Sequence, residues 1–561
     1  MKKIRGARAP VARRWLASRA GLVRGWIAGA ALATASIGGH TQDFLADGAR
    51  VVVATTSGPV VGLQADRVQT FRGIPYAAAP VRELRFLPAI PPRPWKDPKD
   101  ARARGAACPQ VLDLEDPAED GDSNMSEDCL TVNVWTPGAD SKARPVMVFI
   151  HGGALEEGSA ADTSYDGAAL AVRGDLVVVT VQYRLGVLGF LELGEVGGPR
   201  FADSGNLGIL DQIMALRWVQ ANVGGFGGDP RNVTVFGESA GGASIHGLLA
   251  IPAARDLFRR AIIESGDPGQ FLSIGQATAI SARFMALANA HTIKELGGLS
   301  VEELMRAQSK LLAQDYGNGT FGMVQDGRTF DKTPIETLSA NAGLSKPMIV
   351  GSNSEEMRYY IALNATPLDR QPQSILQAHL VRVFGAPARN VLDVYTSDSE
   401  SYPEAVTRLI GDIMFRMPSI RLAELNCGRQ PTFVYLFTFR SSTKGPTGLE
   451  YGAMHGLEIP VVFHLDSALG YMYVGPKGTW NHLSDQMMDA WTRFARTGDP
   501  NGPGLPHWPR YDSAQHATME FGAHTDVALD PYGAERRAWD EIPSRLFEQS
   551  DAVRFADPPA E

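Results

Sequence analysis

The sequence predicts an α/β protein in which a mostly parallel β-sheet is covered by helices on both faces. Short runs of apolar residues alternate with amphipathic stretches along the chain. Continuous apolar strands are typical of parallel sheets, because helices bury both faces of such strands. Of the 561 residues, 44% are hydrophobic and 20% are charged, which indicates a folded rather than a disordered chain.

The predicted elements alternate between strands and helices. DQIMALRWVQANVGGF indicates a helix, since Ile213, Leu216 and Val219 recur near helical spacing and glycines end it. AGGASIHGLLA indicates a second helix. The predicted strands are ARPVMVFI, DLVVVTV, RNVTVFG, KPMIVGSN and PTFVYLFTF. The stretch from about 266 to 346 is mainly helical in pattern, and we expect part of it to form a cap.

The first 35 residues differ from the rest of the chain. They carry eight Lys and Arg residues and no acid, then the apolar stretch WIAGAALATA and the small-x-small site Ala33-Thr34-Ala35. This layout is typical of a secretory signal peptide, and its apolar part is too short to span a bilayer comfortably. We therefore expect export to the periplasm or the exterior, with 36–561 as one domain. An uncleaved anchor or a basic tail is the alternative, and Arg13-Arg14 only partly matches a twin-arginine signal.

The charge of the remaining chain argues against nucleic acid as a partner. The formal charge of the full chain is −9, and removal of the eight cations makes it −17. A protein of this charge repels phosphate. We expect no stable membrane association once the signal is removed, and the sequence gives no indication of oligomeric state.

The chain contains three cysteines. Cys108 and Cys129 are close enough in sequence to close a short loop in an oxidising compartment. Cys427 then remains single, and we expect it to be buried as a small apolar residue. No cysteine spacing resembles a zinc site.

The segment VTVFGESAGG is the first candidate for chemistry. Its Gly-Glu-Ser-Ala-Gly core, at 237–241, follows a strand-like run and opens a helix-like one. This is the setting of a nucleophile elbow, in which glycines let strand and helix approach and the hydroxyl of Ser239 is exposed. The bare pattern is common, and a serine that merely caps a helix is the alternative.

A serine hydroxyl needs a base to become a good nucleophile. Among the histidines after Ser239, His455 lies in EYGAMHGLEIP, a glycine-flanked loop after a predicted strand, where it can take and return a proton. The imidazole needs an acid to fix its tautomer. Glu355 and Glu356 both follow a predicted strand end, and the order serine, acid, histidine of α/β-hydrolases does not choose between them.

A second glycine-rich turn completes the candidate site. VMVFIHGGALEEG contains a predicted strand that ends at His151-Gly152-Gly153-Ala154. Small residues there let backbone N–H groups approach a substrate oxygen, and the N–H of Ala240 is a further donor. A simple glycine turn is the alternative.

Across most of its length, the chain resembles the type B carboxylesterases, the cholinesterase-like and para-nitrobenzyl-esterase-like branch of the α/β-hydrolases. The likeness runs from about Val53 to Asp512. The motifs that carry it are FRGIPYAAAP, SEDCLTVNVWTP, GNLGILDQIMALRWVQANVGGFGGDPRNVTVFGESAGG, GSNSEE, GAMHGLEIP and RFARTGDPNGPGLPHWP.

The resemblance implies an α/β-hydrolase fold with helical cap insertions and no metal or cofactor. It implies Ser239 as nucleophile, His455 as base, and Glu356 as acid, because the family pattern Gly-x-x-x-x-Glu that starts at Gly351 ends on Glu356. It also implies three oxyanion donors and one disulfide. The donors are Gly153, Ala154 and Ala240, and the disulfide joins Cys108 to Cys129.

Three places depart from the family pattern. Leu155 stands where an aromatic residue is common, which bears on the shape of the pocket. Glu156 and Glu157 follow it, and a solvated loop is a better interpretation of them than an entrance for cationic substrates. Glu264 stands where glutamine is more usual, before Ser265 and Gly266.

The predicted function is hydrolysis of a small-molecule carboxylic ester through an acyl-enzyme on Ser239. Two alternatives remain at this point. The same machinery acts on an amide, carbamate or lactone, or the chain is a cholinesterase-like binding module without catalysis. The second is disfavoured because Ser239, His455 and Glu356 are all present.

Overall fold

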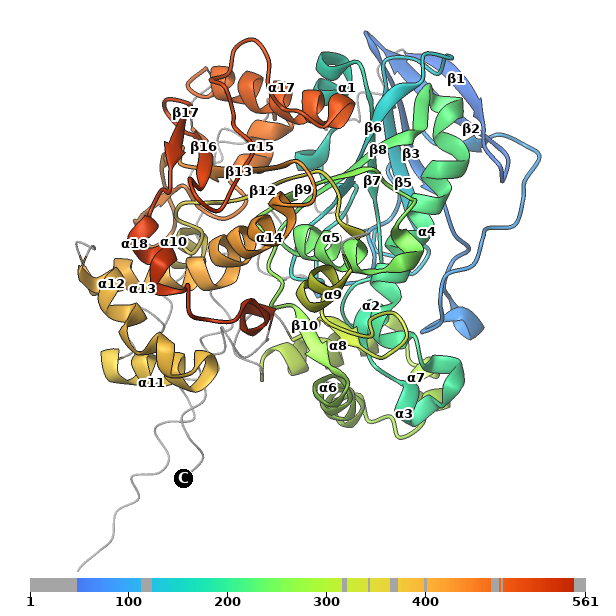
Figure 1. The fold of residues 1–561 in the computed structure, drawn as a ribbon. Helices are drawn as coiled ribbons and strands as arrows, with labels where there is room; N and C mark the ends of the chain where they lie inside the picture. Colours follow the sequence, from blue (N-terminus) through green and yellow to red (C-terminus); the bar gives the residue numbers. More distant parts are fainter. Residues whose placement is uncertain are drawn as a thin grey trace, which may run out of the picture.

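A thirteen-stranded β-sheet forms the centre of the computed structural model, counted over the residues that the structure describes (Figure 1). Those residues are 48–111, 124–314, 320–341, 344–363, 372–397, 401–465, 474–475 and 478–548. The predicted signal peptide, 1–35, lies outside them. In spatial order the strands are β1 (Ala49–Ala54), β2 (Pro59–Ala65), β3 (Val68–Pro75), β5 (Thr131–Thr136), β7 (Val177–Val181), β6 (Arg144–Ile150), β8 (Gly228–Glu238), β9 (Arg260–Glu264), β12 (Met348–Asn353), β13 (Thr432–Phe437), β16 (Ala517–Phe521) and β17 (Asp526–Leu529), with β4 (Lys99–Asp100) beside β2.

The sheet is parallel at its centre and antiparallel at its edges. From β7 through β6, β8, β9, β12 and β13 to β16, every neighbouring pair is parallel. The pairs from β1 to β7 and the pair β16–β17 are antiparallel. The predicted mostly parallel sheet is therefore confirmed, whereas the antiparallel edges were not predicted. The outermost strands β1 and β17 are largely exposed, which an antiparallel sheet edge tolerates.

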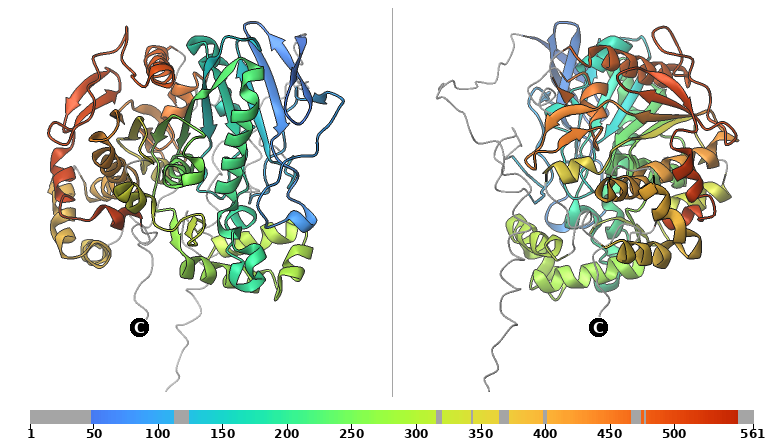
Figure 2. Two further views of the ribbon diagram at one scale, coloured as in Figure 1. Left: turned by 45° about the vertical axis from the view of Figure 1, so that its right-hand side comes forward. Right: turned by 90° about the vertical axis from the view of Figure 1, so that its left-hand side faces the viewer.

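Alternate residues of β6 point into two different cores. Val146, Val148 and Ile150 pack with α4 and α5, while Met147 and Phe149 pack with α1 and α17. Because successive side chains of a strand point to opposite faces, this division shows that helices cover both faces of the sheet. Figures 1 and 2 show the same arrangement from three sides.

The helices are of three kinds by position. Those against the sheet are α1 (Ala168–Gly174), α4 (Leu207–Asn222), α5 (Ala240–Ala250), α14 (Met417–Cys427) and α17 (Asn481–Thr497), on which pack α2 (Gly186–Phe190, on α4), α9 (Pro334–Ala340, on α5) and α15 (Glu458–Val462, on α17). One outer group is α3 (Gly194–Gly197), α6 (Ile274–Leu287), α7 (Ile293–Gly298) and α8 (Val301–Leu312). The other is α10 (Arg358–Leu363), α11 (Gln373–Phe384), α12 (Val391–Ser397), α13 (Tyr402–Gly411) and α18 (Gly533–Ala538).

The predicted helical stretch at 266–346 contains α6 to α9, as expected, and a feature that was not predicted. β10 (Phe271–Ser273) and β11 (Met323–Gln325) form a separate two-stranded parallel sheet. Each of these strands has only three residues, which is too short for an alternating or apolar pattern to be recognised in the sequence. Ser273 ends β10 and caps α6 through a capping box, so the small sheet leads directly into the helical segment.

The predicted disulfide between Cys108 and Cys129 is present. Both cysteines are completely buried in the core beneath the edge of the sheet. Cys427, which was expected to be buried, is only half-buried and lies at the end of α14.

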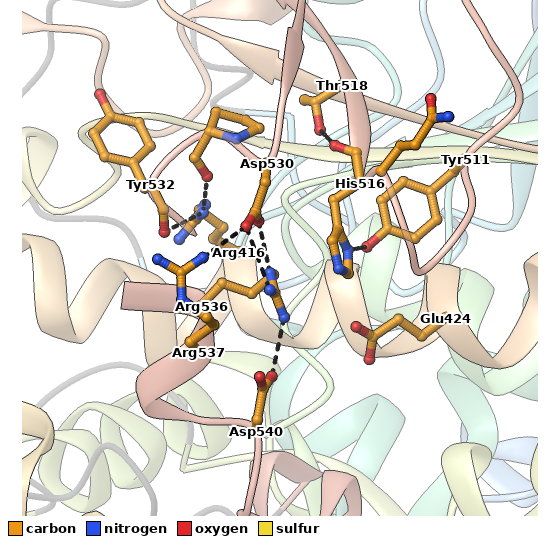
Figure 3. A network of polar contacts seen from close by, with 12 residues as sticks. Arg416, Glu424, Tyr511, His516, Thr518, Asp530, Tyr532, Arg536, Arg537 and Asp540 are labelled. Atoms are coloured by element: carbon orange, nitrogen blue, oxygen red, sulfur yellow. Dashed lines mark hydrogen bonds and ion pairs between the residues drawn. The ribbon is translucent and has the colours of Figure 1, made fainter. Parts of the chain in front are cut away.

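The side chain of Arg416 holds a π-helical turn at 412–416, between α13 and α14, and Figure 3 shows it beside Tyr532, next to the ion pairs of Asp530. Arg416 is buried and donates to the carboxylate of Asp412 at 2.9 Å and to the backbone carbonyl of Pro531 at 2.5 Å. Asp530 in turn binds Arg536 at 2.7 Å. A buried guanidinium is tolerated only when its donors are paired, so this network ties the turn to the C-terminal region.

The aromatic core on the α17 side supports a direct stability test. The ring of Phe149 has its centroid 4.7 to 5.0 Å from those of Tyr165, Phe236 and Phe463. We predict that Phe149→Ala lowers the free energy of unfolding by about 3–5 kcal/mol, because it leaves a cavity in this core. Urea denaturation followed by tryptophan fluorescence measures the change. Val52→Ala, at a side chain that is 59% exposed, is the matched control and should change stability by less than about 0.5 kcal/mol.

Candidate active site

Ser239 lies on the sharp turn between β8 and α5. Its backbone has φ 56° and ψ −123°, a conformation that is strained for serine and typical of a nucleophile elbow. Glycine is required two residues later, because a Cβ on Gly241 would lie 1.9 Å from the carbonyl oxygen of Ile150. The backbone N–H of Ser239 donates to the carbonyl of Glu264 at 2.9 Å and fixes the turn against β9. The predicted strand, turn and helix are therefore confirmed.

His455 lies on the loop between β15 (Glu450–Gly452) and α15, and its ring contacts the buried carboxylate of Glu356. Nδ1 of His455 lies 2.7 Å from Oε2 of Glu356. The other carboxylate oxygen accepts hydrogen bonds from the hydroxyl of Ser265 and the backbone N–H of Asn353, each at 2.7 Å. Three donors, one of them the imidazole, thus surround the carboxylate of Glu356, which is 2% exposed. Because this carboxylate accepts from Nδ1, it fixes the imidazole proton on that nitrogen.

Glu355, the other candidate acid, faces away from His455. Its carboxylate binds Arg358 at 2.8 Å and Arg440 at 2.5 Å, and it accepts from the backbone N–H of Ala453 at 2.9 Å. Of the two adjacent glutamates, only Glu356 contacts the imidazole.

The second ring nitrogen of His455 faces Glu238 rather than Ser239. Nε2 lies 3.2 Å from Oε1 of Glu238, and no hydrogen bond joins Ser239 to His455 within the described residues. All three groups are nevertheless neighbours. A Cβ on Gly152 would lie 2.9 Å from Oε2 of Glu238 and 3.0 Å from Cβ of Ser239. Sequence reasoning missed Glu238 because it treated its place in the elbow motif as variable.

The protonation of Glu238 and that of His455, both buried, depend on each other. Burial raises the pKa of Glu238 to about 7, against the opposing effect of a charged His455. Burial disfavours the charged form of His455, but the carboxylates of Glu238 and Glu356 outweigh it and raise its pKa to about 10. Because each group changes the pKa of the other, the two titrate as a pair. Protonation of Glu238 removes one of the charges that hold the proton on His455.

Two aromatic rings restrain the imidazole. Phe415 lies with its ring centroid 4.5 Å from that of His455, and Tyr360 lies at 6.5 Å. Phe415 belongs to the π-helical turn that Arg416 anchors. Such turns interrupt a regular helix and are frequent at functional sites. No signal in the sequence points to this contact, since neither ring lies in a recognised motif.

Three more buried carboxyl groups belong to the same electrostatic environment. Burial raises the pKa of Glu264 to about 8 and that of Asp267 to about 7, and it also raises the pKa of Glu458. Glu264 accepts a hydrogen bond from the indole of Trp491 at 2.5 Å. A carboxyl group that keeps its proton is neutral, like the amide of glutamine. This explains physically how glutamate replaces the more usual glutamine before Ser265.

The expected oxyanion donors lie on two turns with free N–H groups. Gly153 and Ala154 have φ of 102° and 55°, and Ala240 is the first residue of α5. Within the described residues, none of these three backbone N–H groups donates a hydrogen bond. The first N–H groups of a helix have no acceptor inside it, so that of Ala240 is available to a ligand.

The two glutamates after Leu155 have different environments. Leu155 is completely buried, and so is most of Glu156, whose carboxylate accepts from the backbone N–H groups of Thr320 and Phe321 at 3.1 and 3.4 Å. The expectation of a solvated loop is therefore wrong for Glu156, which instead ties this loop to the segment before β11. Glu157 is exposed, as expected.

Comparison with known proteins identifies the family. The sequence pattern of the carboxylesterase family matches residues 49–539. The chain belongs to the carboxylesterase family. It is 36% identical over 493 residues to the para-nitrobenzyl esterase of Bacillus subtilis (strain 168). This match covers 87% of this chain and 98% of that relative. It is also 36% identical over 475 residues to the human protein named cocaine esterase, with 80% and 82% coverage.

Solved carboxylesterase structures share the fold. The carboxylesterase EST55 of Geobacillus stearothermophilus at pH 6.2 matches with a TM-score of 0.79 and 37% identity, over 87% of this chain and 100% of that chain. A thermophilic PNB esterase matches with a TM-score of 0.78 and 34% identity, over 87% and 99%. The fold is the α/β-hydrolase fold, and this carboxylesterase-family protein is a carboxylic ester hydrolase of the serine type.

The coupled pair of Glu238 and His455 predicts a change in pH dependence. A histidine that acts as base must be neutral, so activity rises with pH through its pKa. Glu238→Gln removes a charge that raises this pKa. The ascending limb of kcat/KM against pH should therefore move to lower pH in the variant. Glu302→Gln, at an exposed glutamate of α8, is the control and should leave the profile in place. A profile of Glu238→Gln that coincides with wild type, or shifts to higher pH, contradicts the prediction.

Proposed function

We propose that Ser239, His455 and Glu356 are the nucleophile, base and orienting acid with which this carboxylesterase hydrolyses small-molecule esters. The observation that carries the assignment is the 2.7 Å contact between His455 and a three-fold hydrogen-bonded Glu356, on a loop that borders the elbow of Ser239. Such a relay activates a serine hydroxyl and stabilises the imidazolium that forms.

In the proposed first step, Oγ of Ser239 attacks the ester carbonyl and Nε2 of His455 takes the hydroxyl proton. The imidazolium then gives that proton to the leaving alcohol oxygen, and the acyl group remains on Ser239. In the second step His455 takes a proton from water, which attacks the acyl carbonyl; the bond between the acyl carbon and Oγ of Ser239 then breaks, the acid is released, and His455 returns the proton to Oγ. Glu356 keeps its charge throughout and holds the ring orientation.

The proposed oxyanion donors are the backbone N–H groups of Gly153, Ala154 and Ala240. They stabilise the negative charge that develops on the carbonyl oxygen during each attack. Their support is that all three N–H groups are free of partners within the described residues and come from the two turns beside Ser239. The loss of one such donor lowers turnover by about 10²–10³-fold in comparable sites.

Before the reaction begins, Nε2 of His455 must exchange Glu238 for Ser239 as its partner. This nitrogen lies 3.2 Å from Glu238 and must instead accept from Ser239. Catalytic hydrogen bonds often form only when substrate is bound. A proton on Glu238 weakens its attraction for His455 and so favours the change.

The substrate class proposed is small esters with a benzylic alcohol. Support comes from the Bacillus subtilis relative, which is named a para-nitrobenzyl esterase and is matched over nearly its full length.

The activity is tested with p-nitrophenyl and p-nitrobenzyl esters of graded acyl length. We predict that Ser239→Ala lowers kcat by at least about 10³-fold on every ester that the wild type hydrolyses, because no nucleophile remains. Ser273→Ala, which removes only the cap of α6, should keep wild-type turnover. Amide and lactone substrates complete the panel. Turnover that persists in Ser239→Ala, or a folded wild type that hydrolyses only amides or lactones, overturns the proposal.

The proposed domain is 36–561, with 266–346 contributing part of a cap. In support, Phe284 of α6 and Leu304 of α8 belong to the same apolar core as Val146 of the central sheet. A shared core makes independent folding of the cap unfavourable.

The proposed localisation is secreted or periplasmic. The Cys108–Cys129 disulfide supports it, because such bonds persist in oxidising compartments. Among the helices that the structure describes, none has the length and apolar character to cross a membrane.

Export predicts a shortened chain. Expression of the full sequence in a bacterium with intact export systems should give extracytoplasmic protein whose intact mass lacks roughly the first 35 residues, as signal cleavage requires. Replacement of Lys2, Lys3 and Arg5 by glutamate should reduce the exported fraction. A full-length mass in the cytoplasmic fraction contradicts the localisation and leaves the proposed catalytic residues untouched.

A further inference from the structure

Gln110 joins the disulfide to the loop that carries two proposed oxyanion donors. Its amide oxygen accepts from the backbone N–H of Gly158 at 2.9 Å. Its amide nitrogen donates to the carbonyl of Gly158 and to the carbonyl of Cys108, each at 3.1 Å. The side chain is 7% exposed, so these bonds form away from bulk water. Both backbone groups of one glycine are thus held by one buried amide.

Gly158 is in direct contact with the beginning of the same loop. A Cβ on Gly158 would lie 2.5 Å from Nδ1 of His151 and 2.7 Å from the carbonyl oxygen of Gly152. The loop from 151 to 158 therefore closes on itself, with its last residue packed against its first two. The position of Gly158 sets the position of the intervening turn.

The closed loop is packed against the nucleophile. Gly152 lies against Ser239 so closely that a Cβ on the glycine would be 3.0 Å from Cβ of the serine, which leaves no room for a methyl group. Within the turn, Ala154 and Leu155 both have φ near 60°, which costs on the order of 1 kcal/mol or more for each non-glycine residue. A strained turn of this kind keeps its shape only when its neighbours hold it.

The disulfide supplies a rigid base for Gln110. Cys108 is two residues away in sequence, its carbonyl accepts from the Gln110 amide, and its sulfur is bonded to Cys129. Both cysteines are completely buried. A continuous set of contacts thus runs from the disulfide through Gln110 and Gly158 to Gly152 and the elbow.

We infer that Gln110 is a positioning residue, which holds the 151–158 loop on the disulfide so that the N–H groups of Gly153 and Ala154 meet the oxyanion. The inference rests on the proposed function, because it concerns the oxyanion donors assigned there. Gln110 touches neither Ser239 nor His455, so its effect passes through the loop alone.

Gln110→Met tests the inference, since methionine matches glutamine in length and lacks the amide. Loss of oxyanion positioning should lower kcat on a p-nitrophenyl ester by roughly 10- to 100-fold with KM changed less than about threefold. The inhibition constant of an aryl trifluoromethyl ketone, which forms a tetrahedral oxyanion adduct on the serine, should rise by the same factor as kcat falls. A merely structural role would lower the unfolding temperature without this agreement.

Gln220→Met is the matched control. The Gln220 amide also donates to two backbone carbonyls, those of Pro230 and Leu257, and it lies far in sequence and topology from the 151–158 loop. This variant should keep wild-type kcat and ketone affinity. A Gln110→Met enzyme whose kcat and ketone affinity stay within twofold of wild type overturns the inference.

The role of the disulfide is tested in a double-mutant cycle. The pair Cys108→Ala and Cys129→Ala should lower kcat in the wild-type background and cause little further loss in Gln110→Met, because both act on one loop. Fully additive losses overturn the link to the disulfide. Activity retained in Ser239→Ala contradicts the proposed function instead, whatever Gln110 does, so the two failures are distinguishable.

Discussion

The buried carboxylate of Glu356 is the constraint on which the rest of the site depends. An ionised carboxylate in a protein interior costs several kcal/mol unless donors surround it. The donors come from three separate parts of the chain: the end of β12, the turn after β9, and the loop after β15. These parts are brought together by the parallel sheet, whose strands β9 and β12 are direct neighbours. The sheet order therefore satisfies the charge, and the charge in turn orients His455.

Burial in the protein interior raises the pKa of other carboxyl groups near His455. Glu238, Glu264 and Asp267 all have a raised pKa because burial disfavours their charge. The charges of Glu238 and Glu356 raise the pKa of His455 to about 10, so the imidazole is charged at neutral pH and must lose its proton before it acts as a base. Carboxyl groups that carry protons near neutral pH leave the imidazole less strongly stabilised in its charged form. Burial of acids beside a base thus moderates the field that those acids would otherwise exert.

The sequence predicted the main strands and helices and the turn at Ser239 because these depend on local pattern. The runs that form β6, β8 and β12 are apolar on both faces, and Ser239 lies in a motif whose glycines have a steric purpose. Choosing Glu356 over Glu355 needed the family pattern, since neighbouring residues share the same local signals. Glu238, Phe415 and Gln110 could not be predicted, because each acts through a contact with a residue far away in the chain. Glu156 was misjudged for the same reason, as its partners at 320 and 321 are visible only in three dimensions.

The loop at 151–158 shows why such distant contacts are needed. Two successive non-glycine residues, Ala154 and Leu155, have left-handed backbone, a conformation that the isolated chain would leave. The fold opposes this from several sides. Tyr183 stacks on His151 and donates to its carbonyl, Leu155 is enclosed in the core, and its carbonyl accepts from Gly186. Each contact removes an alternative shape for the turn. The proposed oxyanion donors, fixed in this way, need no reorganisation when charge develops on a substrate, which is the property that electrostatic stabilisation of a transition state requires.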